Sequence, residues 1–168
     1  MSRALYRFEV RLIKSGHRYG EERTMILVEK ATEQELGSIW ALDRMVIGNS
    51  SRKDFLADAV RASQCWLAHI GDTVAGFGVL EQSFYRQGFV SLLMTHPNYR
   101  RCGVATALIH HLESICPTEK LFTSTNESNL IAQRVYETLG FVRSGYIDNL
   151  DEGDPEIMYF KRLRGDSA

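Results

Sequence analysis

The sequence predicts an α/β fold of the α+β type, with helices flanking a mixed, mostly antiparallel sheet. Short apolar runs bounded by turn residues recur along the chain, and segments with helical spacing stand between them. The 168 residues suffice for one domain with its own core. Since no repeat, linker or low-complexity tract divides the chain, we expect one domain over residues 24–168. Residues 1–23 form an N-terminal extension that could hold an extra strand.

The first elements follow from local signals. Segment 5–13 alternates apolar and charged residues, which is typical of an edge strand. Residues 24–30 are rich in β-branched side chains and predict a strand. Thr32 followed by Glu35 is a capping-box signal for a helix that extends to about residue 46. Its apolar side includes Met45.

The remaining elements are predicted in the same way. Ser51 and Asp54 repeat the helix start signal, and we expect this second helix to end near residue 62. Two apolar runs flank the turn Gly71-Asp72 and predict a hairpin. The later elements are a central strand at 88–96, a helix at about 101–115, a strand at 120–125, a helix at 129–139 and two final strands around an acidic turn.

Composition and charge exclude several classes of protein. The formal net charge of −1 argues against nucleic-acid binding through bulk charge. No apolar run is long enough to span a bilayer, and the N-terminus lacks the apolar core of a secretory signal. Three widely spaced cysteines, Cys65, Cys102 and Cys116, match neither a metal site nor a disulfide framework. We therefore expect a cytoplasmic protein with reduced thiols and no metal.

The stretch "HPNYRRCGVATAL" (96–108) joins a strand to a helix and is a candidate anion site. The first N–H groups of a helix lack internal partners and lie at the positive end of its dipole, so the amides of residues 101–105 could hold a pyrophosphate. The alternative is an ordinary strand-to-helix connection in which Gly103 relieves crowding. Local physics leaves both open, but the P-loop and Rossmann glycine patterns are absent from the sequence.

Two motifs carry a family resemblance. Residues 100–105, RRCGVA, resemble the R/Q-x-x-G-x-G/A motif of the GNAT superfamily of acyl-CoA-dependent N-acyltransferases. The segment "SNLIAQRVYETLGF" (128–141) is similar to that family's S-N-x-x-A-x-x-x-Y-x-x-x-G-F segment. The predicted element order over residues 24–163 agrees with the family fold, so two motifs in register support one another.

The resemblance implies where acetyl-CoA, a co-substrate, would bind. In the family, two neighbouring strands are splayed and acyl-CoA lies in the gap between them. The pantetheine arm pairs with the free strand edge, the helix-start amides hold the pyrophosphate, and an asparagine of the second motif contacts the pantetheine. The positions of this chain that match are Leu93, Met94, Thr95, Arg100, Arg101, Cys102, Gly103, Val104, Ala105 and Asn129.

The resemblance also assigns Tyr136 to the position that protonates the departing CoA thiolate. A phenol suits this role because its hydroxyl donates a hydrogen bond and then a proton. The competing interpretation is that Tyr136 is a core side chain with its hydroxyl at the edge. Asn129 likewise could be a helix N-cap, a ligand, or both.

The general base is less well determined. In one branch of the family a glutamate on the strand before the second motif assists, and this chain has Ser124 at that position. Glu81 is our candidate, because that region serves water-mediated deprotonation in some family members. A solvated strand-end glutamate and a water chain to solvent remain alternatives.

The acidic segment "NLDEGDPE" (149–156) has two interpretations. It is either a solvated turn, since Asp, Gly and Pro favour turns, or it borders the acceptor site, where its field would attract a cationic amine. On the second interpretation Asp151 and Glu152 bind substrate, and Tyr85 in an earlier loop lines the same side.

Together these observations predict an N-acetyltransferase in which an amine attacks acetyl-CoA directly within a ternary complex. The acceptor is a small cationic amine or a peptide or protein amine. A ping-pong cysteine is disfavoured because no paired histidine is evident. The alternative is a non-catalytic acyl-CoA sensor or interaction module. The acceptor's identity, the base and the oligomeric state stay open, and the N-terminal stretch leaves a homodimer open.

Overall fold

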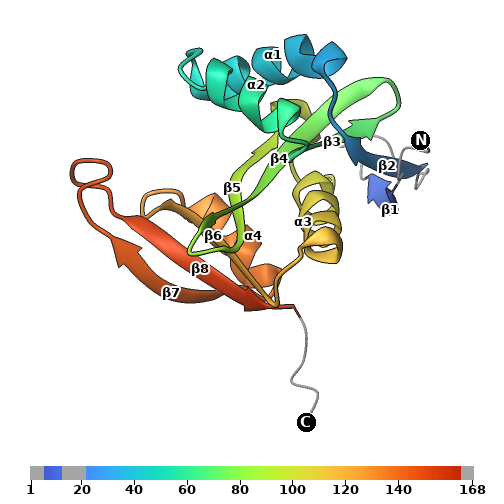
Figure 1. The fold of residues 1–168 in the computed structure, drawn as a ribbon. Coiled ribbons are helices and arrows are strands. Elements are labelled where there is room, and N and C mark those ends of the chain that lie inside the picture. Colours follow the sequence, from blue (N-terminus) through green and yellow to red (C-terminus); the bar gives the residue numbers. More distant parts are fainter. Residues whose placement is uncertain (1–5, 13–21, 164–168) are drawn as a thin grey trace. The chain divides into compact units, whose positions relative to one another are not determined.

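A computed structural model describes residues 6–12 and 22–163. The eight strands of this part of the chain form one sheet in the order β1-β2-β3-β4-β5-β6-β8-β7 (Figure 1). The strands are β1 (Tyr6–Leu12), β2 (Glu22–Lys30), β3 (Cys65–Ile70), β4 (Thr73–Phe84), β5 (Gln87–Thr95), β6 (Lys120–Asn126), β7 (Val142–Ile147) and β8 (Glu156–Arg162). The helices are η1 (Glu33–Glu35), α1 (Leu36–Ile47), α2 (Lys53–Arg61), η2 (Pro97–Tyr99), α3 (Val104–Ile115) and α4 (Leu130–Thr138).

The predicted fold class and element order are confirmed. The alternating segment near the N-terminus forms β1, which pairs with β2 at one end of the strand order. The loop expected at 14–23 lies largely outside the described residues. β5 and β6 form a parallel pair in an otherwise antiparallel set of pairings. The chain forms two compact units, Met1–Val79 with Leu92–His111, and Leu80–Ser91 with Leu112–Ala168.

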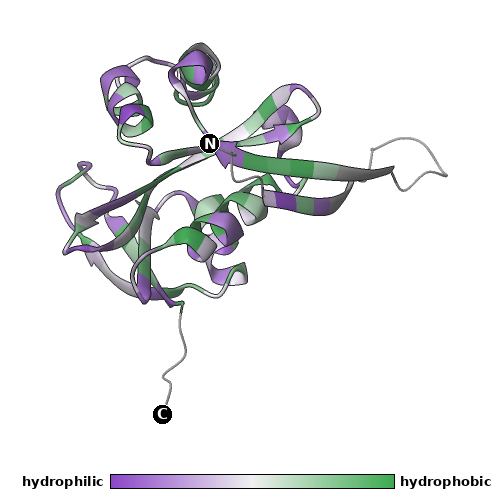
Figure 2. Ribbon diagram, turned by 45° about the vertical axis from the view of Figure 1, so that its right-hand side comes forward, coloured by the Kyte–Doolittle hydropathy of each residue, from purple (hydrophilic) through white to green (hydrophobic). Residues whose placement is uncertain are grey.

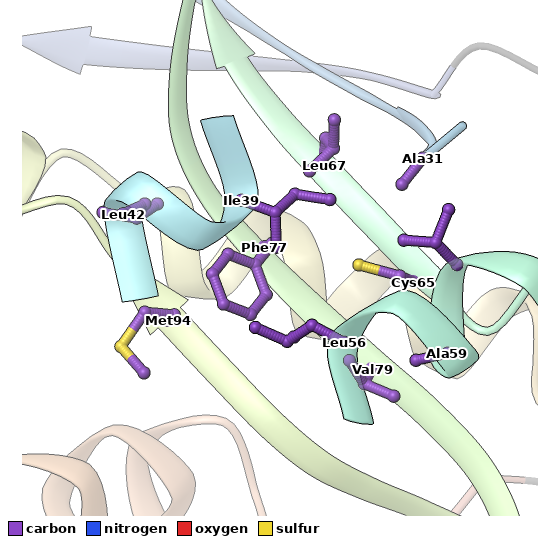
Figure 3. Packing of buried hydrophobic residues seen from close by; sticks show 11 residues of the cluster. Ala31, Ile39, Leu42, Leu56, Ala59, Cys65, Leu67, Phe77, Val79 and Met94 are labelled. Carbon is purple, nitrogen blue, oxygen red and sulfur yellow. The ribbon is translucent and has the colours of Figure 1, made fainter. Parts of the chain in front are cut away.

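The core of the first unit lies between α1, α2 and the strands β3 and β4. Ile39 of α1, Leu56 of α2 and Phe77 of β4 are fully buried there (Figure 3). The capping box is present, because the Thr32 N–H donates to the Glu35 carboxylate at 2.7 Å. The helices α1 and α2 each carry both hydrophobic and hydrophilic residues (Figure 2). This amphipathic pattern allows each helix to bury its apolar side in the core.

One residue expected in this core lies outside it. Met45 is 57% exposed, whereas Leu42 and Asp43 on the same helix are buried. The physical reason is the helix period of about 3.6 residues per turn, which places Met45, six residues after Ile39, about 120° around the helix from Ile39 and off the buried stripe of Ile39, Leu42 and Asp43. Asp43 keeps an ion pair with Arg52 at 3.3 Å, and burial raises the pKa of its carboxyl while the guanidinium opposes the rise.

A close approach beneath α3 depends on Gly76 of β4. A Cβ at this position would lie 2.6 Å from both the Met94 carbonyl oxygen of β5 and a methyl of Val104 on α3. Since one of these atoms belongs to the backbone, no side-chain rotation could relieve the clash. Gly76 therefore allows α3 to begin close to β4.

In the second unit, β6 and β7 both pair antiparallel with β8. β5 pairs with β6 over Gly88–Val90 and Leu121–Thr123, and both strands continue beyond this stretch. Lys161 of β8 ties two helices to the sheet, because its ammonium group donates to Glu113 of α3 at 2.6 Å and to the Leu139 carbonyl after α4 at 2.8 Å. These bonds hold α4 on the sheet.

Candidate functional site

The segment before α3 leads into the N-terminus of this helix, where the first backbone N–H groups have no acceptor within the helix. The N–H of Ala107 donates to the Gly103 carbonyl at 2.9 Å, so the helix begins directly after Gly103. The helix therefore starts three residues later than predicted from spacing. The amides of Val104 and Ala105 belong to the first turn, where N–H groups have no intrahelical acceptor. These two amides fit an anion.

The loop residues just before this helix have unusual backbone conformations. Arg101 and Gly103 both have positive φ, 61° and 80°. The Cys102 N–H donates to the Tyr99 carbonyl at 3.3 Å, so this predicted anion donor already has an internal acceptor. Glycine adopts a φ of 80° without strain, so the backbone conformation alone explains why a glycine stands at position 103, whether or not a ligand binds there. Arg100 and Arg101 are exposed.

His96 has a structural role at the end of β5. Its Nδ1 accepts from the Asn98 N–H at 3.1 Å and so caps η2. The His96 N–H donates to the Ala75 carbonyl of β4 at 2.8 Å. This agrees with the expectation that His96 is a strand-end residue and not a base.

The same hydrogen bond fixes the orientation of the strand residues expected to contact pantetheine. Backbone groups alternate in direction along a strand, so Met94 shares the direction of His96, toward β4. The Met94 side chain lies in the first core (Figure 3). Leu93 and Thr95 direct their N–H and C=O groups away from β4, and they are the residues of this stretch that could pair with a ligand.

Tyr136 of α4 is buried in the second unit, with 5% of its surface exposed. Its ring lies 5.6 Å from that of Tyr159 and 5.9 Å from that of Phe141, between centroids. Burial raises the pKa of Tyr136, a hydrogen bond with the Thr123 side chain opposes the rise, and the charges of Glu156 and Tyr159 add to it. The phenol is therefore protonated throughout the neutral range.

Asn129 caps α4, as one of the interpretations of the sequence expected. Its Oδ1 accepts from the Ala132 N–H at 3.2 Å. The cap uses the amide oxygen and leaves the NH₂ group to contact a ligand. A capping role and a ligand role for Asn129 are therefore compatible.

The acidic segment between β7 and β8 holds the residues that precede Asn129. The Asp154 carboxylate accepts from the Ser128 N–H at 2.9 Å and from the Ser128 hydroxyl at 2.6 Å. Both bonds lower the pKa of Asp154. The Asn126 amide donates to Asp151 at 2.7 Å, and the Glu127 N–H donates to the Pro155 carbonyl at 2.8 Å. We call residues 126–128 with Asp151, Asp154 and Pro155 the loop clamp.

The loop clamp gives the acidic segment a structural role that the sequence patterns did not indicate. Asp151, expected to bind substrate, already accepts a hydrogen bond from Asn126. Glu152 is exposed at the tip of this segment. Tyr85 is 85% exposed and, with Arg86, forms the two-residue turn between β4 and β5, where both residues have positive φ. Glu81 lies partly exposed on β4.

Comparison with known proteins identifies the family. The profile of the Acetyltransferase (GNAT) family matches residues 27–141. The chain belongs to the GNAT family of acetyltransferases. A crystal structure of a GNAT-family acetyltransferase from Bacillus cereus is 39% identical, covers 82% of this chain and 97% of its own, and has a TM-score of 0.79.

Two more distant relatives of this GNAT chain carry functional names. N-alpha-acetyltransferase 30 of Xenopus laevis is 31% identical over 88 residues, which are 47% of this chain and 32% of that protein. Naa50 of Arabidopsis thaliana, solved in complex with the bisubstrate analogue CoA-Ac-MVNAL, shares the fold with 19% identity, a TM-score of 0.68 and coverage of 81% and 97% of the two chains. The chain spans a third or less of the length of the curated relatives it matches.

Two further properties of the GNAT chain concern metals and membranes. Among residues 6–12 and 22–163, no three His, Cys, Asp or Glu side chains are grouped so that they could hold a metal ion. No helix in the same part of the chain has the length and hydrophobicity to cross a membrane. The three cysteines are free thiols, and burial raises the pKa of Cys65 to about 12.

Proposed function

We propose that this GNAT protein is an N-acetyltransferase that transfers the acetyl group of acetyl-CoA to a primary amine. The observation that carries the proposal is Tyr136, a buried phenol in the second family motif whose pKa lies above its ordinary value. Such a group keeps its proton at neutral pH and is able to give it to a leaving thiolate.

The reaction consists of one direct transfer. The neutral amine nitrogen attacks the thioester carbon, the C–S bond breaks, and the electron pair goes to sulfur. Tyr136 protonates the sulfur, and the positively charged nitrogen of the new amide loses its extra proton to a base or to water. Glu81, on β4, is our candidate for the base. Because both substrates are held together, orientation supplies much of the rate enhancement.

Acetyl-CoA is the donor that fits the described residues. The first-turn amides of Val104 and Ala105 suit a pyrophosphate, and the exposed Arg100 and Arg101 add positive charge. The NH₂ group of Asn129 suits a carbonyl of the pantetheine arm. The CoA-based bisubstrate analogue bound by Arabidopsis Naa50 supports a CoA ligand for this fold.

The acceptor is a primary amine, either a small cationic amine or the amine of a peptide. The similarity to an N-alpha-acetyltransferase supports a peptide amine. The exposed carboxylate of Glu152 and the exposed ring of Tyr85 suit a cationic acceptor. Asp151 contributes its charge to the same field although it is hydrogen-bonded to Asn126.

The experiment measures thiol release from acetyl-CoA against a panel of amines and short peptides, with the acetylated product identified by mass. Turnover with any acceptor, lost in Tyr136→Phe, supports the proposal. Ser124 stands where one branch has a catalytic glutamate, so a non-catalytic acyl-CoA sensor is the second candidate. Binding of acetyl-CoA without turnover across the panel would favour that second candidate.

A further inference from the structure

Thr123 of β6 has a completely buried hydroxyl side chain in the second unit. Its Oγ1 donates to the Val90 carbonyl of β5 at 3.0 Å. Val90 and Thr123 are also the final pair in the register between these two parallel strands. The hydroxyl therefore lies where the β5–β6 pairing ends.

The pairing of the strands places this hydroxyl beside Tyr136. Thr123 is the cross-strand partner of Tyr159 in the antiparallel pair of β6 and β8, and the Tyr159 ring lies 5.6 Å from the Tyr136 ring between centroids. Burial raises the pKa of the phenol, and a hydrogen bond between the Thr123 and Tyr136 side chains lowers it. A threonine hydroxyl has one proton to donate and two lone pairs that accept. Since the proton of Thr123 is donated to Val90, the phenol must be the donor in its bond with Thr123. The resting arrangement is a chain in which Tyr136 donates to Thr123 and Thr123 donates to Val90.

We propose that Thr123 is a positioning residue that orients the Tyr136 hydroxyl for proton transfer and stabilises the phenolate that remains afterwards. This inference rests on the proposed function. When the C–S bond breaks, the electron pair goes to sulfur and the Tyr136 proton follows it. The Thr123 hydroxyl then turns its proton from the Val90 carbonyl to the phenolate oxygen, and the phenolate recovers a proton from solvent.

In the part of the chain that the structure describes, the other groups around Tyr136 do not stabilise its phenolate. The carboxylate of Glu156 on β8 and the phenol of Tyr159 both disfavour a negative charge on Tyr136. Burial and Glu137 of α4 raise the pKa of Tyr159, and Arg143 of β7 lowers it. Of the described groups that act on Tyr136, the Thr123 hydroxyl is the one that favours the phenolate.

The test compares Thr123→Val, which replaces the hydroxyl by a methyl of similar size, with Thr123→Ser, which keeps it. We expect Thr123→Val to lower kcat by about 10- to 100-fold, with the KM for acetyl-CoA changed less than twofold. Thr123→Ser should retain kcat within about threefold of the parent. Should Thr123→Val fail to fold, Thr123→Cys is the second variant, and its weak S–H donor should give a kcat between those of the serine variant and Tyr136→Phe.

A double-mutant cycle separates positioning from packing. In a Tyr136→Phe background, Thr123→Val or Thr123→Cys should cause no further loss of kcat, because the group it positions is gone. Additive losses, or a serine variant as impaired as the valine variant, would overturn the inference. If Tyr136→Phe itself leaves kcat unchanged, the acid role in the proposed function fails. If that variant is impaired but Thr123→Val is not, only the role of Thr123 fails.

Discussion

The loop before α3 and the surroundings of Tyr136 are built from different chemistry. The loop offers backbone amides at a helix start, beside exposed arginines and two residues of positive φ. Tyr136 is a buried side chain held by the Thr123 hydroxyl and two aromatic rings. Under the proposed function, the loop binds the ligand through its backbone amides and Tyr136 donates one proton. Variants of the two regions should therefore fail in different kinetic constants.

The largest expected effect belongs to Tyr136→Phe. Removing the acid should lower kcat by about 100-fold or more, whereas the KM for acetyl-CoA should change little. Steady-state kinetics with the best acceptor measures both. Tyr159→Phe is the matched control, because its hydroxyl donates within the same core to Gln133 and Glu137 at 3.4 and 3.3 Å. Equal losses of kcat in both variants would contradict a specific role for Tyr136.

The pH dependence of kcat and of stability tests the protonation state of Tyr136. Burial raises the pKa of Tyr136 above its ordinary value of 10.0. The phenol therefore keeps its proton below that pH, and its titration should cause no loss of kcat there. Above pH 10 the unfolded chain ionises this phenol before the folded chain does, so stability should fall as pH rises. A fall of kcat near neutral pH that disappears in Tyr136→Phe would show that the phenol titrates lower.

Packing beneath the start of α3 should respond to Gly76→Ala. The new methyl would clash with the Met94 carbonyl and with Val104, which should lower the free energy of unfolding by about 1–3 kcal/mol. Gly37→Ala is the matched control, because the space around Gly37 in α1 is open. That control should gain about 0.5–1 kcal/mol from helix propensity, and urea unfolding measures both. Equal stabilities of the two variants would mean that α3 can move away from β4.

The smallest expected effect concerns the loop clamp. Asp154→Asn weakens the bonds to Ser128 directly before Asn129, and it should raise the KM for acetyl-CoA about threefold while kcat stays within twofold. Asp148→Asn, an exposed change directly before the acidic segment, is the control and should leave both constants unchanged. A change in the KM for the amine instead of for acetyl-CoA would mean that this segment acts on the acceptor.

Local features of the fold were predictable from the sequence because neighbouring residues determine them. The capping box of Thr32 and Glu35, the Gly71-Asp72 turn and the Asn129 cap each depend on residues within four positions. The start of α3 was predicted too early, since Arg101 adopts a φ of 61°, a conformation that an arginine rarely takes.

Contacts between distant segments could not be predicted in this way. Thr123 bonds to Val90, 33 positions away, and Ser128 bonds to Asp154, 26 positions away. Nothing in the periodicity of either segment signals these partners. The family motifs pointed to Tyr136 and Asn129, whereas Thr123 and the acidic-segment residues of the loop clamp lie outside both motifs.

The central claim is that the loop binds through its backbone while Tyr136 performs the chemistry. The most direct test measures kcat and KM with acetyl-CoA and with S-acetylpantetheine, which lacks the pyrophosphate. Gly103→Val should raise the KM for acetyl-CoA about tenfold, and more than Arg101→Ala does, yet leave the constants for S-acetylpantetheine unchanged. Tyr136→Phe should lower kcat equally with both donors. A larger rise in KM from Arg101→Ala than from Gly103→Val, or a Gly103→Val variant impaired equally with both donors, would contradict this division of roles.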